Sequence, residues 1–229
     1  MQERVKVLEE RKSTRNSESL VRIPVGSVKL EGTLSIPDGA EALVLFAHGG
    51  GSSRLSPRNN YVAQVLRKAG LATLLFDLLT EQEDRIYENR FDIPLIAKRL
   101  MSATQWIKTH SETEGMRIGY FGASTGAAAA LQAAAEAGQD IGAIVSRGGR
   151  PDLAEPYLPS VHAPTLLIVG ERDDVVIKLN KEAFQRITAE KDLVIVPGAS
   201  HLFEEPGKLE DVARLATNWF TKYLRKITM

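Results

Sequence analysis

Short apolar runs that alternate with helical patterns are the feature that most constrains the fold of this chain. Each run is continuous, as expected for a strand that is buried on both faces. The runs occupy residues 43–47, 71–76, 116–121, 141–146 and 165–169. Between them, apolar residues recur at helical spacing, as in 57–68, 93–109 and 124–137. Strands that alternate with helices predict an α/β fold with a mainly parallel sheet flanked by helices.

The two ends of the chain complete this pattern. Residues 19–25 and 28–36 are rich in β-formers around a Pro-Val-Gly turn, and they predict an antiparallel N-terminal hairpin. The last elements expected are a helix at 176–187, a strand at 192–196 and a helix at 209–225. The segment 147–164 is too short for a cap domain, since a separate domain needs about 50 residues or more. We therefore expect a tail at 1–17 and a single domain at 18–229 without a cap.

Composition excludes several classes of protein. The 229 residues fit one domain, and 29 basic residues balance 29 acidic ones, so a nucleic-acid partner is not expected. The chain has no cysteine, which excludes disulfides and thiolate metal sites, and its four histidines are scattered. The N-terminus is charged and lacks the apolar stretch of a secretory signal. The longest uncharged run, 118–135, contains a glycine turn that a membrane span would not tolerate. We expect a cytoplasmic protein with no membrane partner.

A glycine-rich turn is the strongest candidate for chemistry. Residues 122–126 read Gly-Ala-Ser-Thr-Gly and join an expected strand to an expected helix. In this setting Ser124 lies on a tight turn that exposes its hydroxyl, and glycines two residues away on each side allow close backbone approach. The amide of Thr125, at the helix N-terminus, would point toward developing negative charge. The alternative is a turn with a structural role only.

Three further groups could complete a catalytic site. A serine hydroxyl needs a base, and His201 follows the last strand at the appropriate end of the sheet. An acid that orients the imidazole could be Asp173, Asp174 or Glu171, although these residues could equally cap the next helix. Residues 48–51 read His-Gly-Gly-Gly, and their backbone amides could supply a second oxyanion donor.

In this chain order, these residues resemble the α/β-hydrolase superfamily, and most closely its dienelactone-hydrolase-like branch. The resemblance covers residues 18–227. It implies that Ser124 is the nucleophile, His201 the base and Asp173 the orienting acid. It also implies an oxyanion hole formed by the Thr125 amide and an amide of Gly50 or Gly51. One residue departs from the pattern, because dienelactone hydrolases carry cysteine where this chain has serine. That difference favours ordinary carboxylic esters as substrates.

Two charged segments lie on the side of the sheet where such folds bind ligands. Arg147 and Arg150 follow a strand and could bind a substrate carboxylate, or they could form ion pairs with Asp152 or Glu155. The segment 80–90 is dense in charge and predicts a solvated loop that could border the pocket.

Together these features predict a serine esterase that cleaves small or short-chain esters through an acyl-enzyme, with an open, shallow pocket and no cofactor or metal. The same triad could serve a thioesterase, a peptidase or a perhydrolase, or it could be broken in a non-catalytic ligand-binding homologue. The partner expected is a small-molecule ester. Assembly is left open, with a homodimer as one option.

Overall fold

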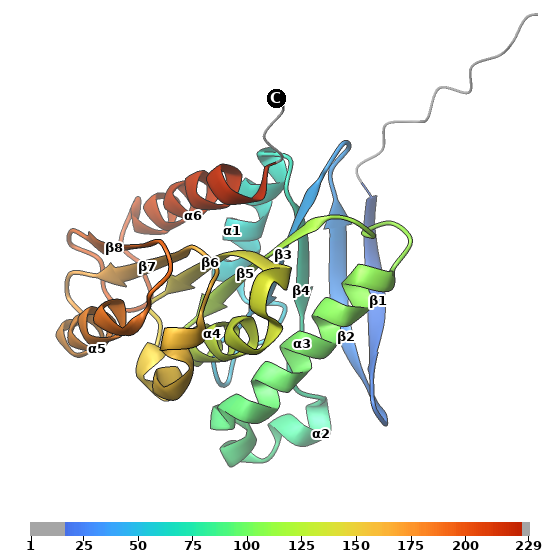
Figure 1. Cartoon of the computed structure of the whole chain (residues 1–229), viewed down its shortest axis with the longest axis horizontal. Helices are drawn as coiled ribbons and strands as arrows, with labels where there is room; N and C mark the ends of the chain where they lie inside the picture. Colours follow the sequence, from blue (N-terminus) through green and yellow to red (C-terminus); the bar gives the residue numbers. More distant parts are fainter. Residues whose placement is uncertain (1–16, 226–229) are drawn as a thin grey trace, which may run out of the picture.

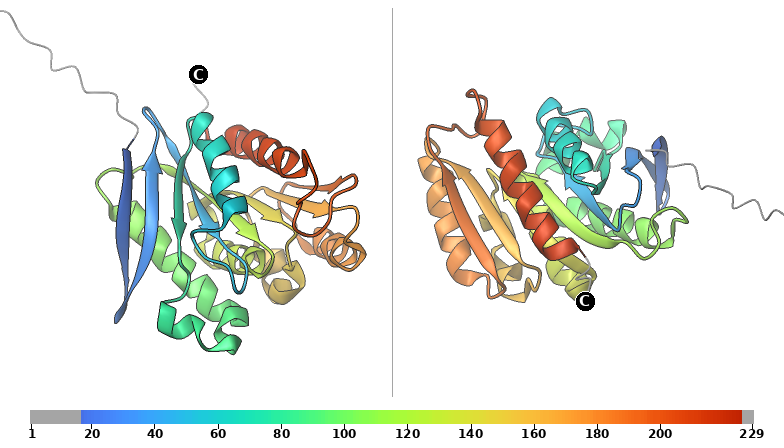
Figure 2. Two further views of the ribbon diagram at one scale, coloured as in Figure 1. Left: turned by 180° about the vertical axis from the view of Figure 1, so that it is seen from behind. Right: turned by 90° about the horizontal axis from the view of Figure 1, so that it is seen from above.

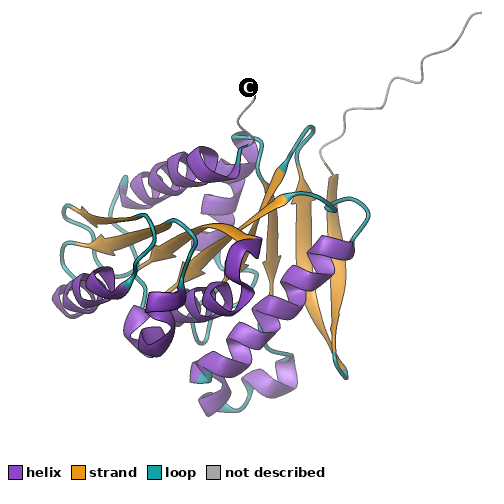
Figure 3. Ribbon diagram, in the orientation of Figure 1, coloured by secondary structure: helices purple, strands orange, loops and turns teal. Residues whose placement is uncertain are grey.

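The computed structural model describes residues 17–225, which form one eight-stranded sheet between two layers of helices (Figures 1 and 3). The strand order is β1-β2-β4-β3-β5-β6-β7-β8, and β2 pairs antiparallel with both of its neighbours, β1 and β4, whereas the other pairs are parallel. The strands are β1 (Ser17–Val25), β2 (Val28–Ile36), β3 (Ala42–Ala47), β4 (Ala72–Phe76), β5 (Arg117–Ala123), β6 (Ile141–Arg147), β7 (Thr165–Gly170) and β8 (Lys191–Val196).

Helices cover both faces of this sheet. Helices α1 and α6 lie on one face, and α3, α4 and α5 lie on the other (Figure 2). The α-helices are α1 (Pro57–Lys68), α2 (Glu81–Asp84), α3 (Ile93–Thr109), α4 (Thr125–Ala137), α5 (Asp174–Arg186) and α6 (Lys208–Leu224). The 3₁₀ helices are η1 (Tyr87–Phe91), η2 (Gly138–Asp140) and η3 (Pro151–Ser160).

The central strands contribute to two hydrophobic cores, one on each face. In β3, Leu43 and Leu45 pack with α3 and α4, whereas Val44 and Phe46 pack with α1 and α6. Because successive side chains of a strand point to opposite faces, a strand covered on both sides must be apolar throughout. This requirement explains the continuous apolar runs of the sequence.

The structure confirms the expected α/β fold, the N-terminal hairpin and the absence of a cap domain. Between β6 and β7 the chain forms only η3, which contains Pro156 and Pro159 and so does not continue as an α-helix. Short helices α2 and η1 overlap the segment 80–90, which the sequence predicted to be a solvated loop. The tail expected at 1–17 lies outside the described residues except for Ser17, which is the first residue of β1 and not part of a tail. Among residues 17–225, no helix is long and apolar enough to cross a membrane.

One buried polar contact ties α3 to the sheet. Tyr120 of β5 is fully buried, and its hydroxyl lies 2.6 Å from Oγ1 of Thr104 on α3. Oγ1 of Thr104 already donates to the carbonyl of Leu100, so it accepts from the tyrosine. Burial raises the pKa of Tyr120 and keeps the hydroxyl protonated as the donor.

Two substitutions should separate the contributions of this contact. Thr104→Val leaves a buried hydroxyl without an acceptor and should cost about 1–3 kcal/mol of unfolding free energy, whereas Tyr120→Phe should cost about 1 kcal/mol. Urea unfolding at neutral pH measures both. Equal losses, or a larger loss for Tyr120→Phe, would contradict this assignment of donor and acceptor.

Candidate active site

Ser124 lies between β5 and α4 in a backbone conformation that is rare for a residue with a side chain. Its φ is 52° and its ψ is −121°. Left-handed torsions of this kind cost of order 1–3 kcal/mol and persist only where the surroundings enforce them. The preceding strand is buried and α4 is almost entirely buried, so the turn is fixed at both ends.

Two glycines permit this turn. A Cβ atom at Gly122 would lie 2.4 Å from the Cα of Ala127, and one at Gly126 would lie 2.2 Å from the carbonyl oxygen of Ala47. Neither contact can be relieved by moving a flexible side chain, because the opposing atoms belong to the backbone. The expectation that these positions need residues without side chains is therefore confirmed.

His201 and Asp173 form a bonded pair beyond the ends of β7 and β8. Nδ1 of His201 lies 2.5 Å from Oδ2 of Asp173. The carboxylate is mostly buried and the imidazole is 39% exposed, so the acid is shielded while the ring remains accessible. An acceptor on Nδ1 places the proton on that nitrogen and leaves Nε2 as the basic atom.

Close packing of two loops brings this pair together. A Cβ at Gly170 would lie 2.5 Å from the carbonyl oxygens of Ala199 and Ser200, so the end of β7 touches the loop that carries the histidine. The amide of Ser200 donates to the carboxylate of Glu205, and this bond lowers the pKa of Glu205. The first contact packs the loop against the end of β7, and the second fixes the conformation of the loop itself.

The other two candidate acids have different places. Glu171 accepts the amide of Gly198 at 2.7 Å and so fixes the histidine loop through its backbone. Asp174 is the first residue of α5. Of the three acids that the sequence left open, Asp173 is the one bonded to the imidazole.

A turn after β6 links the serine to the histidine. The amide of Ser124 donates to the carbonyl of Arg147, and the amide of Arg150 donates to the carbonyl of Ser124. Between them, Gly148 lies against the imidazole, since a Cβ there would be 3.4 Å from Cε1 of His201. The serine turn and the histidine ring therefore flank the same short segment at one edge of the sheet.

The glycine segment after β3 borders the serine on its other side. A Cβ at Gly49 would lie 3.1 Å from the Cβ of Ser124, so this backbone is in direct contact with the serine. The amide of Gly50 donates to Oγ1 of Thr125 at 2.8 Å. An oxyanion would have to compete with this hydroxyl for the Gly50 amide. The next residue, Gly51, has a φ of 72°.

His48 anchors this glycine segment as a neutral imidazole. Its Nε2 accepts the amide of Leu78 at 3.2 Å, so Nδ1 carries the proton and donates to the carbonyl of Gly49 at 3.0 Å. Burial lowers the pKa of His48, and this effect outweighs the opposing bond to Gly49.

The two candidate arginines differ in their surroundings. Arg150 forms a two-point ion pair with Asp152, at 2.9 and 2.7 Å, and this partner raises its pKa. Of the two roles that the sequence left open for Arg150, the structural ion pair is therefore the one observed. Glu155 pairs with Arg186, so neither expected acid neutralises Arg147.

Arg147 is a buried cation with little compensation. It is 7% exposed, its Nη2 donates to Oδ1 of Asn59 at 3.3 Å, and its Nε has no partner within residues 17–225. Burial and the nearby Arg58 lower the pKa of Arg147 to about 10. A buried guanidinium in such surroundings favours the approach of an anion.

Sequence reasoning missed three positions that support the site. Gly49 contacts the serine, Gly148 contacts the histidine ring, and the fully buried Asn180 of α5 donates to the carbonyl of Gly149 at 3.0 Å. The glycines belong to segments that the sequence did single out. Asn180 gives no local signal, because its importance depends on a contact with a residue 31 positions away.

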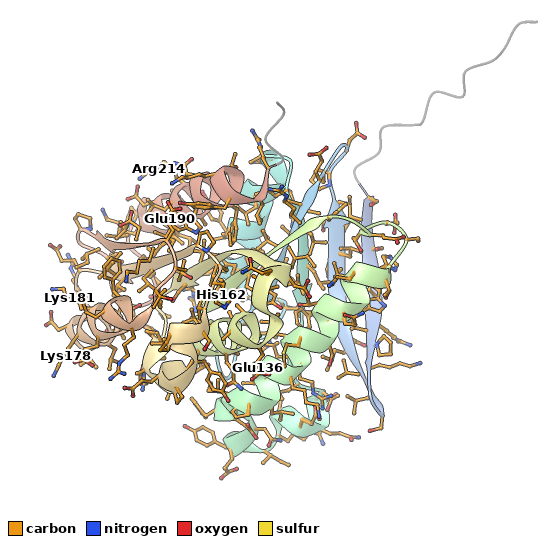
Figure 4. The ribbon with its side chains drawn as sticks, viewed as in Figure 1. Glu136, His162, Lys178, Lys181, Glu190 and Arg214 are labelled. Carbon is orange, nitrogen blue, oxygen red and sulfur yellow. The ribbon has the colours of Figure 1, made fainter. Side chains whose placement is uncertain are left out.

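The remaining histidines lie away from this cluster. His110 stacks on Trp106 at 4.5 Å between ring centres, and His162 is exposed on the segment between η3 and β7 (Figure 4). Within the described residues, no group of three or more His, Asp or Glu side chains could hold a metal ion.

Comparison with known proteins identifies the family. The model of the dienelactone hydrolase family matches residues 30–226, and the chain belongs to that family. Its fold is the α/β-hydrolase fold. A dienelactone hydrolase from Anabaena variabilis ATCC 29413 is 57% identical, with a TM-score of 0.89 over 92% of this chain and 99% of its own.

Other relatives share the fold at low identity or match this chain over only part of their own length. Est1E from Butyrivibrio proteoclasticus is 16% identical, with a TM-score of 0.77 over 89% of this chain and 98% of its own. A Mycobacterium tuberculosis protein, provisionally named a phosphoribosyl transferase, is 56% identical over 89% of this chain but 46% of its own. The chain thus spans about half the length of the curated relatives that it matches most strongly.

The neutral state of His48 predicts a pH dependence of stability. The folded pKa is below the unfolded value of about 6.5, so the stabilisation is present above that pH and is lost as the pH falls toward the folded pKa. As the pH falls, the unfolding free energy of His48→Gln should therefore decline less steeply than that of the wild type, by up to about 1.4 kcal/mol per pH unit.

Urea unfolding between pH 5 and 8 measures this difference. The exposed His162 provides the matched control, and His162→Gln should follow the wild-type curve. Parallel curves for wild type and His48→Gln would contradict the neutral assignment.

Proposed function

We propose that this chain is a serine esterase that cleaves small or short-chain carboxylic esters. The single observation that carries the proposal is that Ser124 lies on a strained, glycine-flanked turn bonded to the same short segment that contacts His201, whose ring is bonded to Asp173. The family assignment to hydrolases and the esterases among the structural neighbours support it. We assign Ser124 as the nucleophile, His201 as the general base and Asp173 as the orienting acid.

The reaction uses two displacements. Oγ of Ser124 attacks the ester carbonyl while Nε2 of His201 takes its proton, and Asp173 stabilises the imidazolium. The resulting oxyanion accepts bonds from the Thr125 amide and from Gly51, or from Gly50 once its bond to the Thr125 hydroxyl is released. The intermediate collapses, the carbon–oxygen bond to the alcohol breaks, and His201 protonates the leaving alcohol. Water then repeats these steps on the acyl-enzyme and releases the acid.

The nature of the nucleophile and the absence of a cap favour simple substrates. Serine replaces the cysteine of dienelactone hydrolases, which favours ordinary esters over dienelactones. Because η3 is the only structure between β6 and β7, nothing from that segment forms a domain over Ser124. We therefore propose an open site that selects small or short-chain acyl groups.

We also propose that Arg147 binds a carboxylate of the substrate. It is buried beside the serine turn, and no acid among residues 17–225 pairs with it, in contrast to Arg150. Arg150 would contribute only by releasing Asp152. The phosphoribosyl transferase name belongs to a protein about twice as long as this chain.

Probe labelling tests the nucleophile. A fluorophosphonate should label the wild type at Ser124, and short-chain nitrophenyl esters should be hydrolysed. Ser124→Ala should lose the labelling and about 10⁶-fold in kcat, and Asp173→Asn about 10⁴-fold. The adjacent Asp174→Asn provides the matched control and should retain activity.

Absence of labelling in a folded wild-type protein would contradict the proposal and favour a ligand-binding homologue. A panel of matched thioesters, amides and peroxide distinguishes the thioesterase, peptidase and perhydrolase alternatives. Hydrolysis of long-chain lipids without turnover of short esters would overturn the proposed acyl preference.

If Arg147 binds a carboxylate, the enzyme should prefer negatively charged substrates over neutral ones. Arg147→Met should raise KM for monoesters of dicarboxylic acids by roughly 10–100-fold, because a charge-assisted bond contributes about 1.5–3 kcal/mol. Arg150→Met should have a smaller effect, since Asp152 already occupies its guanidinium. Steady-state kinetics with monoesters and neutral diesters measures this ratio. An equal rise in KM for both substrates would contradict carboxylate binding.

A further inference from the structure

Exposed apolar side chains gather around the candidate active site. Among residues 17–225 eight large apolar side chains are exposed, and all except Leu20 lie on segments that follow parallel strands. These segments include Leu55 after β3, Ile86 after β4, and Leu202, which is adjacent to His201. Apolar residues that cluster at one edge, rather than scatter over the surface, mark a binding region.

Two of these side chains are aromatic rings of η1, and one of them borders the proposed oxyanion hole. Phe91 is 46% exposed, and its Cε1 would be 3.4 Å from a Cβ at Gly50. Tyr87, which is 66% exposed, lies 5.1 Å from Phe91 between ring centres with a tilt of 52°. The Gly50 amide is bonded to Thr125, the residue after the serine. The aromatic pair thus borders the segment that contacts the reacting centre.

The segment that carries these rings is rigidly tied. Arg90 donates to both carboxylate oxygens of Asp84 and to its carbonyl. Thr80 and Glu83 form a reciprocal capping box at the start of α2. Glu83 also pairs with Arg99 of α3, which anchors the segment to a long helix.

Ion pairs thus occupy Glu83, Asp84 and Arg90 of this segment, whereas Tyr87 and Phe91 are exposed next to the exposed Glu88. The sequence predicted a solvated, charged loop, and Glu81, Arg85 and Glu88 are indeed exposed, but the segment also presents two aromatic rings to solvent. A fixed aromatic surface loses little conformational entropy when a ligand binds.

We infer that Tyr87 and Phe91 form an aromatic platform that binds an aryl group of the ester. This inference rests on the proposed esterase function and specifies its substrate class. A tilted pair of rings suits an incoming ring, which can stack or meet an edge at 4.5–7 Å. Two side chains are too small a surface for a stable protein partner, which needs roughly 800 Å² on each side. The aryl group can belong to the acyl or to the alcohol half, and the position of the platform beside Gly50 is compatible with both.

Two pairs of substrates distinguish whether the aryl group belongs to the alcohol half or to the acyl half of the ester. Benzyl acetate against butyl acetate tests the alcohol side, and methyl 3-phenylpropionate against methyl butyrate tests the acyl side. In Phe91→Ala and in Tyr87→Ala, the aryl-to-alkyl ratio of kcat/KM should fall about tenfold for at least one pair. Leu20→Ala removes an exposed apolar side chain on β1 and should leave both ratios unchanged.

Unchanged ratios in the Phe91 and Tyr87 variants would overturn the platform, even if the wild type hydrolyses both esters and is labelled at Ser124. Failure of labelling would instead count against the esterase itself. Ligand-observed NMR that measures the binding of benzyl alcohol and of 3-phenylpropionate tests the platform without turnover. At least one should bind the wild type and Leu20→Ala more tightly than Phe91→Ala, and equal binding of both ligands to all three would overturn the inference.

Discussion

The close approach of backbone to backbone around Ser124 is the constraint on which the site depends. The end of β5 meets the start of α4 at Gly122, and α4 meets the end of β3 at Gly126, at distances that exclude any side chain. This contact forces the serine into a left-handed conformation and seats the alanine-rich α4 against the sheet. The strain is supported by two hydrophobic cores, so the hydroxyl is positioned before any ligand arrives.

The rest of the site is organised by short segments that follow the parallel strands. Backbone amides and carbonyls join the serine turn to the segment after β6, and Gly148 places that segment against His201. Acidic side chains serve three different purposes there: Asp173 bonds the imidazole, while Glu171 and Glu205 hold the histidine loop by its amides. Because most charges pair within these segments, the poorly compensated Arg147 and the exposed aromatic rings stand out as the groups that remain for a ligand.

Local patterns predicted the elements and the chemical groups, whereas long-range contacts determined how the groups are used. Apolar periodicity and glycine spacing are local properties, so the strands, the long helices and the turn at Ser124 follow from the sequence. The choice between Arg147 and Arg150 depends on burial and on which acid lies nearby, and the sequence left it open. The helices α2 and η1 are short and depend on contacts such as Glu83 with Arg99, 16 residues apart, which no local pattern reveals.

The acyl-enzyme is the central claim, and its direct detection is the most decisive measurement. Acid-quenched turnover of nitrophenyl acetate, followed by peptide mapping with mass spectrometry, should show one acetyl group on the peptide that contains Ser124. His201→Gln provides the comparison, because loss of the base should prevent the adduct from forming at a comparable rate. Steady hydrolysis without any acetylated serine, or with the acetyl group on another residue, would contradict the account.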